Sequence, residues 1–116
     1  MLSDIAKALE GTGKPVYYGR AGKLDGPDLW DYIVFWRGSM SPTGNKRAYA
    51  DTYLVTIVQE EFIEDGMAET VIDAMTALPG VRLANGNHPY TYTVKPKTET
   101  VIEMLSLEFV RPRLAQ

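Results

Sequence analysis

The spacing of apolar and polar positions changes along the chain, and each change marks a different element. From residue 2 to residue 10 the apolar positions recur at helical spacing, and Gly11-Thr12-Gly13 follows as a stop signal. We predict a short helix there, with Ser3 as its capping residue. A second helical spacing runs from Ile63 to Leu78 and ends at Pro79-Gly80, which predicts a longer central helix.

Strand-like patterns fill most of the remaining sequence. Residues 30–37 alternate, so that the even-numbered and odd-numbered side chains occupy opposite faces of a strand. Residues 48–60 carry apolar side chains on both faces, as expected of a strand that is covered on two sides. Shorter β-prone runs occupy residues 15–19, 81–83, 90–95 and 99–110.

The order of these segments predicts the fold class. A helix, two or three strands, a helix and a further two or three strands indicate an α+β fold, with a largely antiparallel sheet of about five strands and both helices packed against it. A length of 116 residues fits a single domain, so we predict one domain over residues 1–116. Hydrophobic residues make up 45% of the chain, which is enough for a folded core.

The amino-acid composition excludes several kinds of chemistry. The chain has no cysteine, which excludes disulfides, thiolate nucleophiles and cysteine-based metal sites. No apolar run approaches the roughly 20 residues that span a bilayer, so we expect no membrane contact and synthesis in a reducing cytoplasm. The net charge of −3 has the wrong sign for a broad nucleic-acid-binding face, although local basic patches are compatible with it.

Candidate titratable sites are few. His88 stands beside Pro89 without a second histidine, and we expect it to be a solvated turn residue. Asp65, Glu69 and Asp73 recur every fourth residue and would line one helix face. They could hold a divalent cation, but an acidic surface stripe with Asp65 as a helix cap is the stronger interpretation. With no convergent nucleophile, base or metal set, we expect neither a cofactor nor enzymatic activity.

A basic segment separates the two strongest strands. Glycine, serine and proline dominate residues 38–47, which predicts a flexible hairpin loop. Arg37 precedes this loop, Met40 lies within it, and Lys46 and Arg47 end it. Two interpretations stay open: an ordinary mobile loop, or a segment that orders against a partner or faces DNA in a channel.

The opening helix is followed by Pro15–Gly19, Asp31–Phe35, the loop before Tyr53–Ile57, Val71–Leu78 with Pro79-Gly80-Val81, and Glu103–Arg111. This order of segments, which spans nearly the whole chain, resembles the tail terminator, or tail-completion, proteins of long-tailed bacteriophages. The resemblance implies an α+β subunit that forms a hexameric ring around the DNA channel, caps the tail tube protein and receives the head–tail connector. It places the protein at the tail–head junction of the virion.

A ring subunit contacts its neighbours head to tail, so it needs two different and complementary surfaces. Opposite charges on the two surfaces would favour that contact. We therefore predict that acidic and basic residues at the subunit interface or in the lumen carry the interaction. The charged residues of this set are Arg37, Lys46, Arg47, Asp65, Glu69, Asp73, Arg111 and Arg113, and the set also includes Met40 from the basic loop.

Two alternatives belong beside this hypothesis. One is another small virion component, such as a different head–tail connector or a tail tube subunit, which also associates laterally. The other is a small ligand-binding or enzymatic α+β domain whose pocket uses tyrosine and glutamate side chains, because one fold can host many functions.

Overall fold

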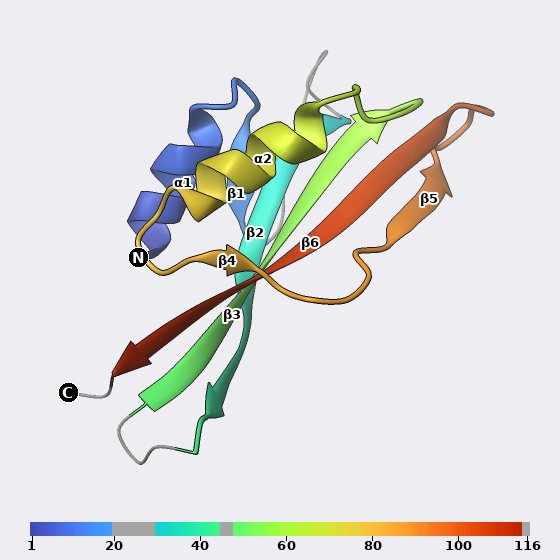
Figure 1. Cartoon of the computed structure of the whole chain (residues 1–116). Coiled ribbons are helices and arrows are strands. Elements are labelled where there is room, and N and C mark those ends of the chain that lie inside the picture. Colours follow the sequence, from blue (N-terminus) through green and yellow to red (C-terminus); the bar gives the residue numbers. More distant parts are fainter. Residues whose placement is uncertain (20–29, 45–47, 115–116) are drawn as a thin grey trace.

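The computed structural model describes residues 1–19, 30–44 and 48–114. Along the chain, a helix and three strands are followed by a second helix and three further strands, as Figure 1 shows. The elements are α1 (Leu2–Glu10), β1 (Val16–Tyr18), β2 (Asp31–Pro42), β3 (Ala48–Glu60), α2 (Met67–Thr76), β4 (Arg82–Leu83), β5 (Tyr90–Val94) and β6 (Val101–Leu114).

All of the strands belong to one six-stranded sheet. Its order is β1-β2-β3-β6-β4, and β5 also pairs with β6. The first pair, β1 with β2, is parallel, whereas every other pair is antiparallel. β3 occupies one edge of β6 from Ile102 to Leu114, and β4 and β5 pair with the opposite edge at separate places. The fold is therefore α+β with a largely antiparallel sheet, as the segment order predicts.

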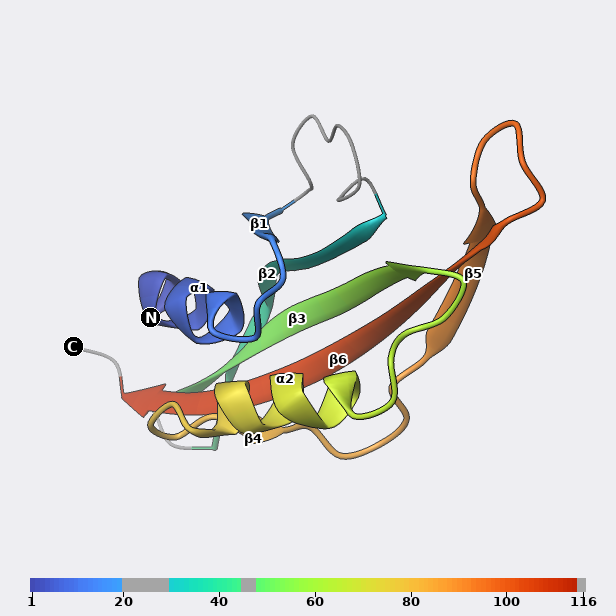
Figure 2. The ribbon, with the colours of Figure 1, turned by 90° about the horizontal axis from the view of Figure 1, so that it is seen from above.

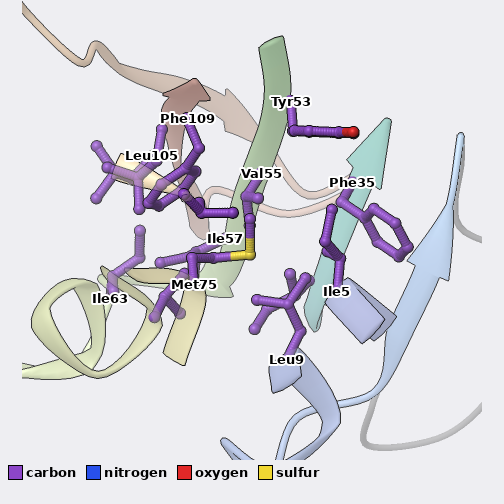
Figure 3. Close-up of a cluster of buried hydrophobic side chains, with 14 residues drawn as sticks. Ile5, Leu9, Phe35, Tyr53, Val55, Ile57, Ile63, Met75, Leu105 and Phe109 are labelled. Carbon is purple, nitrogen blue, oxygen red and sulfur yellow. The ribbon is translucent and has the colours of Figure 1, made fainter. Parts of the chain in front are cut away.

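The hydrophobic core lies between the two helices and one face of this sheet. Helix α1 buries Ile5 and Leu9, and helix α2 buries Val71 and Met75, each of them fully. Figure 3 shows Ile5 and Leu9 beside the sheet and Met75 reaching toward Val55. The sheet contributes Ile33, Phe35, Tyr53, Val55, Ile57, Leu105, Leu107 and Phe109.

Strand register explains why these side chains share a face. Residues directly opposite each other in an antiparallel pair project to the same side of the sheet. Ile33 lies opposite Ile57, and Ile57 lies opposite Leu105, so one apolar row crosses three strands under the helices. The odd-numbered side chains of residues 31–37 therefore occupy the helix-bearing face, and the predicted alternation of this strand is confirmed.

The opposite sheet face carries aromatic side chains. Tyr17 and Tyr32 meet edge to face on it, with ring centroids 5.8 Å apart, and Trp36 lies half-buried on the same strand. Burial together with the nearby Tyr17 raises the pKa of Tyr32 above its ordinary value. Both helices lie on the other side of the sheet, as Figure 2 shows.

The molecule is elongated, with extents of 52 × 25 × 25 Å. The helices cover only the middle of the sheet. At one end β2, β3 and β6 extend past them, and at the other end β5 and β6 do so (Figure 1). Both ends therefore expose strand surface that neither helix covers.

The prediction of a loop over residues 38–47 is wrong for residues 38–42. β2 continues to Pro42, so Met40 is a strand residue that lies opposite Asp51. The register shifts between Arg37 and Ser39, which marks a β-bulge that absorbs the extra residue. Pairing with β3 outweighs the local turn preference, and Pro42 is tolerated because β1 does not extend along this part of β2.

The helix ends also differ from the sequence prediction. α2 begins at Met67 and not near Ile63, because the Ile63 N–H donates to the Glu103 carboxylate at 2.9 Å and is held by the sheet. The residue that precedes α2 is Gly66, with φ of 88°, and no side chain caps the helix. Asp65 is therefore not the cap, and neither is Ser3, since α1 starts after Met1 without a side-chain cap. At the other end of the chain, β6 runs to Leu114, beyond the predicted end at residue 110.

Gly38 is packed too closely for a side chain. A Cβ atom at this position would lie 2.6 Å from Thr52 Oγ1, which itself lies 2.8 Å from Ser39 Oγ. Gly38→Ala should therefore lower the free energy of unfolding by about 1–3 kcal/mol, as overpacking does, because β-branched Thr52 cannot easily turn away. Urea unfolding measures this change.

Gly44→Ala is the matched control for this substitution. Apart from its chain neighbours, no described residue has an atom within 4 Å of a Cβ built on Gly44, so the effect of Gly44→Ala should be about 0.5 kcal/mol or less. Equal unfolding midpoints for the two variants would contradict the packing assigned to the bulge.

Candidate interaction surfaces

A groove of about 400 Å³ lies where the three long strands pass the start of α1. We call it the arginine groove. Strand register builds it, because Met40, Asp51 and Arg111 lie opposite one another on β2, β3 and β6. It is lined by Arg37, Met40, Asp51, Tyr53, Arg111 and Arg113, by Gly38, Ser39 and Thr52, and by Met1 and Leu2.

Arg113 is held in place within the groove. Its Nε donates a short hydrogen bond to Asp51 Oδ2, and the pair is an ion pair in which the Asp51 side chain is 15% exposed. Its Nη2 donates to Met40 Sδ at 3.0 Å, and its guanidinium carbon lies 5.3 Å from the centre of the Tyr49 ring. These contacts fix the guanidinium in one position and neutralise most of its charge.

Arg37 and Arg111 give the groove an excess of positive charge. Neither forms an ion pair with any acid in the part of the chain that the structure describes. Both act on Tyr53 between them: burial and the Asp51 carboxylate raise the pKa of the Tyr53 phenol, while Arg111, Arg37 and Arg113 oppose that rise. Three guanidinium groups thus face one carboxylate, an arrangement that suits a carboxylate or another anionic group from a partner.

The acidic residues occupy a separate surface. Glu69 and Asp73 are exposed on α2, one turn apart, and Asp65 is exposed just before the helix. None of them forms an ion pair with another described residue. We call these residues the acidic stripe. Across residues 1–19, 30–44 and 48–114, no group of three or more histidine, aspartate or glutamate side chains is arranged to hold a metal ion.

The structure brings together some of the predicted interaction residues. Arg37, Met40, Arg111 and Arg113 line one groove although they come from both halves of the chain. Lys46 and Arg47 lie outside the described residues, and their part in an interaction stays a prediction.

Sequence reasoning missed Asp51 and Tyr53, which line the groove from β3, and Tyr49 on the same strand, whose ring lies beside Arg113. Tyr49, Asp51 and Tyr53 stand two residues apart on one strand and therefore share a face. That spacing is visible in the sequence, but only the pairing of β3 with β6 shows that this face meets Arg111 and Arg113.

His88 is not the solvated turn residue that the sequence suggests. It is partly buried, and its Nδ1 accepts the Glu108 N–H at 3.2 Å. Its Nε2 lies 3.0 Å from the Ala84 carbonyl oxygen and donates to it in the tautomer that this pattern requires. The ring thus bridges the segment after β4 to the backbone of β6, which is a structural role.

In the described part of the chain, no helix combines the length and the apolar character that a bilayer crossing requires.

Comparison with known proteins shows limited likeness. No protein-family model matches the chain. No curated protein matches it either. Among solved structures, the chain is similar to the type 4 fimbrial biogenesis protein PilO from Pseudomonas aeruginosa, with 15% identity and a TM-score of 0.47, over 97% of this chain and 66% of that one. It is also similar to a chain in the virion of a native gene transfer agent particle, with 12% identity and a TM-score of 0.49, over 97% and 95%.

Burial of the Tyr53 phenol predicts how the stability of the fold changes at alkaline pH. Its pKa is raised above the ordinary value of 10.0, so the folded state favours the protonated phenol. This contribution is complete below about pH 10 and is lost as the pH rises from about 10 through the pKa of the folded state. Tyr53→Phe should therefore lose less stability than the parent chain over that range, as measured by urea unfolding at neutral and alkaline pH. Parallel pH profiles for the two proteins would contradict the assignment.

Proposed function

We propose that this protein is a structural virion component of a long-tailed phage that works by associating with copies of itself. In this proposal it caps the tail tube as a ring and offers the docking surface for the head–tail connector. One observation carries the proposal: a single subunit has a cationic groove and a separate acidic stripe, and among the described residues neither Arg37 and Arg111 of the groove nor the acids of the stripe have an ion-pair partner.

Two different complementary surfaces favour a head-to-tail contact. In such a contact the acidic stripe of one subunit docks into the arginine groove of the next, and a ring closes if the rotation between neighbours allows it. Arg37 and Arg111 would pair with carboxylates, whereas Arg113 would hold the groove in shape through Asp51. An elongated subunit of 52 × 25 × 25 Å has room for both contacts at different places.

The finer assignment rests on the resemblance of the segment order to tail terminator proteins. That resemblance supports six subunits, the tail tube protein and the head–tail connector as partners, proximity to DNA in the channel, and a virion location after synthesis in the bacterial cytoplasm. A non-catalytic role is part of the same proposal. The described residues of the groove offer arginine, aspartate and tyrosine for binding, but no nucleophile paired with a base.

Charge reversal tests the head-to-tail contact. The double change Glu69→Lys and Asp73→Lys should weaken assembly, because it places like charges against Arg37 and Arg111. Arg37→Glu with Arg111→Glu should do the same, and a chain that carries all four changes should regain assembly. The measurement is native mass by light scattering, with and without tail tube protein. Glu10→Lys, an exposed change of the same sign on α1, is the matched control.

Two results would contradict the proposal. An oligomer mass that none of the charge reversals changes would remove the groove and the acidic stripe from the contact. Long open tubes in electron micrographs of the purified protein would favour a tail tube subunit over a terminator, because a terminator stops at one ring.

A further inference from the structure

β5 has a free edge at the end of the molecule opposite the arginine groove (Figure 1). It pairs with β6 from Tyr90 opposite Leu105 to Val94 opposite Val101. In the part of the chain that the structure describes, no strand pairs with its other edge. An unpaired edge of this kind is a template for another strand.

The hydrogen bonds at both ends of β5 show which backbone groups face outward. The Ser106 N–H donates to the Pro89 carbonyl at 3.1 Å, and the Lys95 N–H donates to the Thr100 carbonyl at 2.9 Å. Alternate residues of an antiparallel strand point toward the same neighbour, so Thr91 also faces β6. The outward-facing N–H and carbonyl groups therefore belong to Tyr90, Tyr92 and Val94.

These residues also expose their side chains. Tyr90 is 53% exposed, Tyr92 is 60% exposed and Val94 is 54% exposed. Phe62 at 61% and Val101 at 42% add apolar surface nearby. No charged residue or proline lies within β5, so two of the usual features that prevent strand addition are missing from this edge.

The occupant that fits this edge is β5 of a second copy. In an antiparallel pair about a two-fold axis at Tyr92, Tyr90 lies opposite Val94 of the partner subunit and Tyr92 lies opposite itself. The outward-facing N–H and carbonyl groups of Tyr90, Tyr92 and Val94 then all form hydrogen bonds to the partner subunit, because these alternate residues direct them to the same side of β5. Aromatic and β-branched side chains oppose one another on one face, and no like charges meet within the paired strands.

We propose that free subunits associate through a symmetric β5–β5 contact, which joins two sheets into one. This contact is separate from the arginine groove and goes beyond the proposed function. A two-fold contact closes on itself, so it makes dimers and no rings. A five-residue strand is short, and the dimer is therefore weak, so the dimeric fraction rises with protein concentration.

A cysteine scan reads the register directly, because the chain has no other cysteine. Opposed residues of a hydrogen-bonded pair have Cα atoms about 5.5 Å apart, within the range of a disulfide. Tyr92→Cys should give a covalent dimer under mild oxidation. Thr93→Cys alone should not, because Thr93 lies opposite Thr91 of the partner subunit, but a mixture of Thr91→Cys and Thr93→Cys chains should cross-link.

A proline substitution tests the outward amide. Tyr92→Pro removes an N–H that faces away from β6, so it should abolish concentration-dependent dimerisation in sedimentation velocity. Tyr92→Thr keeps the amide and is the matched control.

Equal cross-linking of Tyr92→Cys and Thr93→Cys, or a monomer at every soluble concentration, would overturn the contact. The Glu69→Lys and Asp73→Lys changes should leave Tyr92→Cys cross-linking unchanged, which separates a failure of this contact from a failure of the ring contact.

Discussion

β3 is hydrogen-bonded on both sides, and the rest of the structure depends on its register. It pairs with β6 from Ala48 to Glu60 and with β2 from Tyr49 to Gln59. Because side chains alternate between sheet faces, a slip of one residue would move the core row of Val55 and Ile57 away from the helices. The same register places the groove residues of three strands on one face. The register of β3 therefore determines both the packing of the core and the position of the arginine groove.

The strands are longer than the helices that cover them, and this mismatch creates the exposed surfaces. α1 has 9 residues and α2 has 10, whereas β6 has 14. A residue adds about 1.5 Å to a helix but about 3.3 Å to a strand. The apolar face continues under the helices only in the middle of the sheet. Beyond them, arginines line one end and the tyrosines of β5 occupy the other.

Charge is distributed unevenly over this frame. The net charge of the chain is −3, but three arginines face one aspartate in the groove, because most acidic residues lie elsewhere. Arg113 and Asp51 neutralise each other inside the groove, which leaves Arg37 and Arg111 for an external partner. Surfaces of opposite sign on one subunit suit the head-to-tail contact that we propose. The single-domain organisation and the roles of the interaction residues stay predictions.

Local patterns in the sequence determined the elements, because helix and strand periodicity are written in consecutive residues. Helix α1 and strand β3 have the bounds that the sequence predicts, and the α+β class follows from the order of the segments. Only the tertiary structure decided that residues 38–42 form a strand, since hydrogen bonds to β3 outweigh their turn composition. It also decided that His88 bridges to β6, that Asp51 meets Arg113, and that no strand of the described residues pairs with the outer edge of β5. Each of these depends on residues far apart in the chain, and such pairings leave no periodic signal in the sequence.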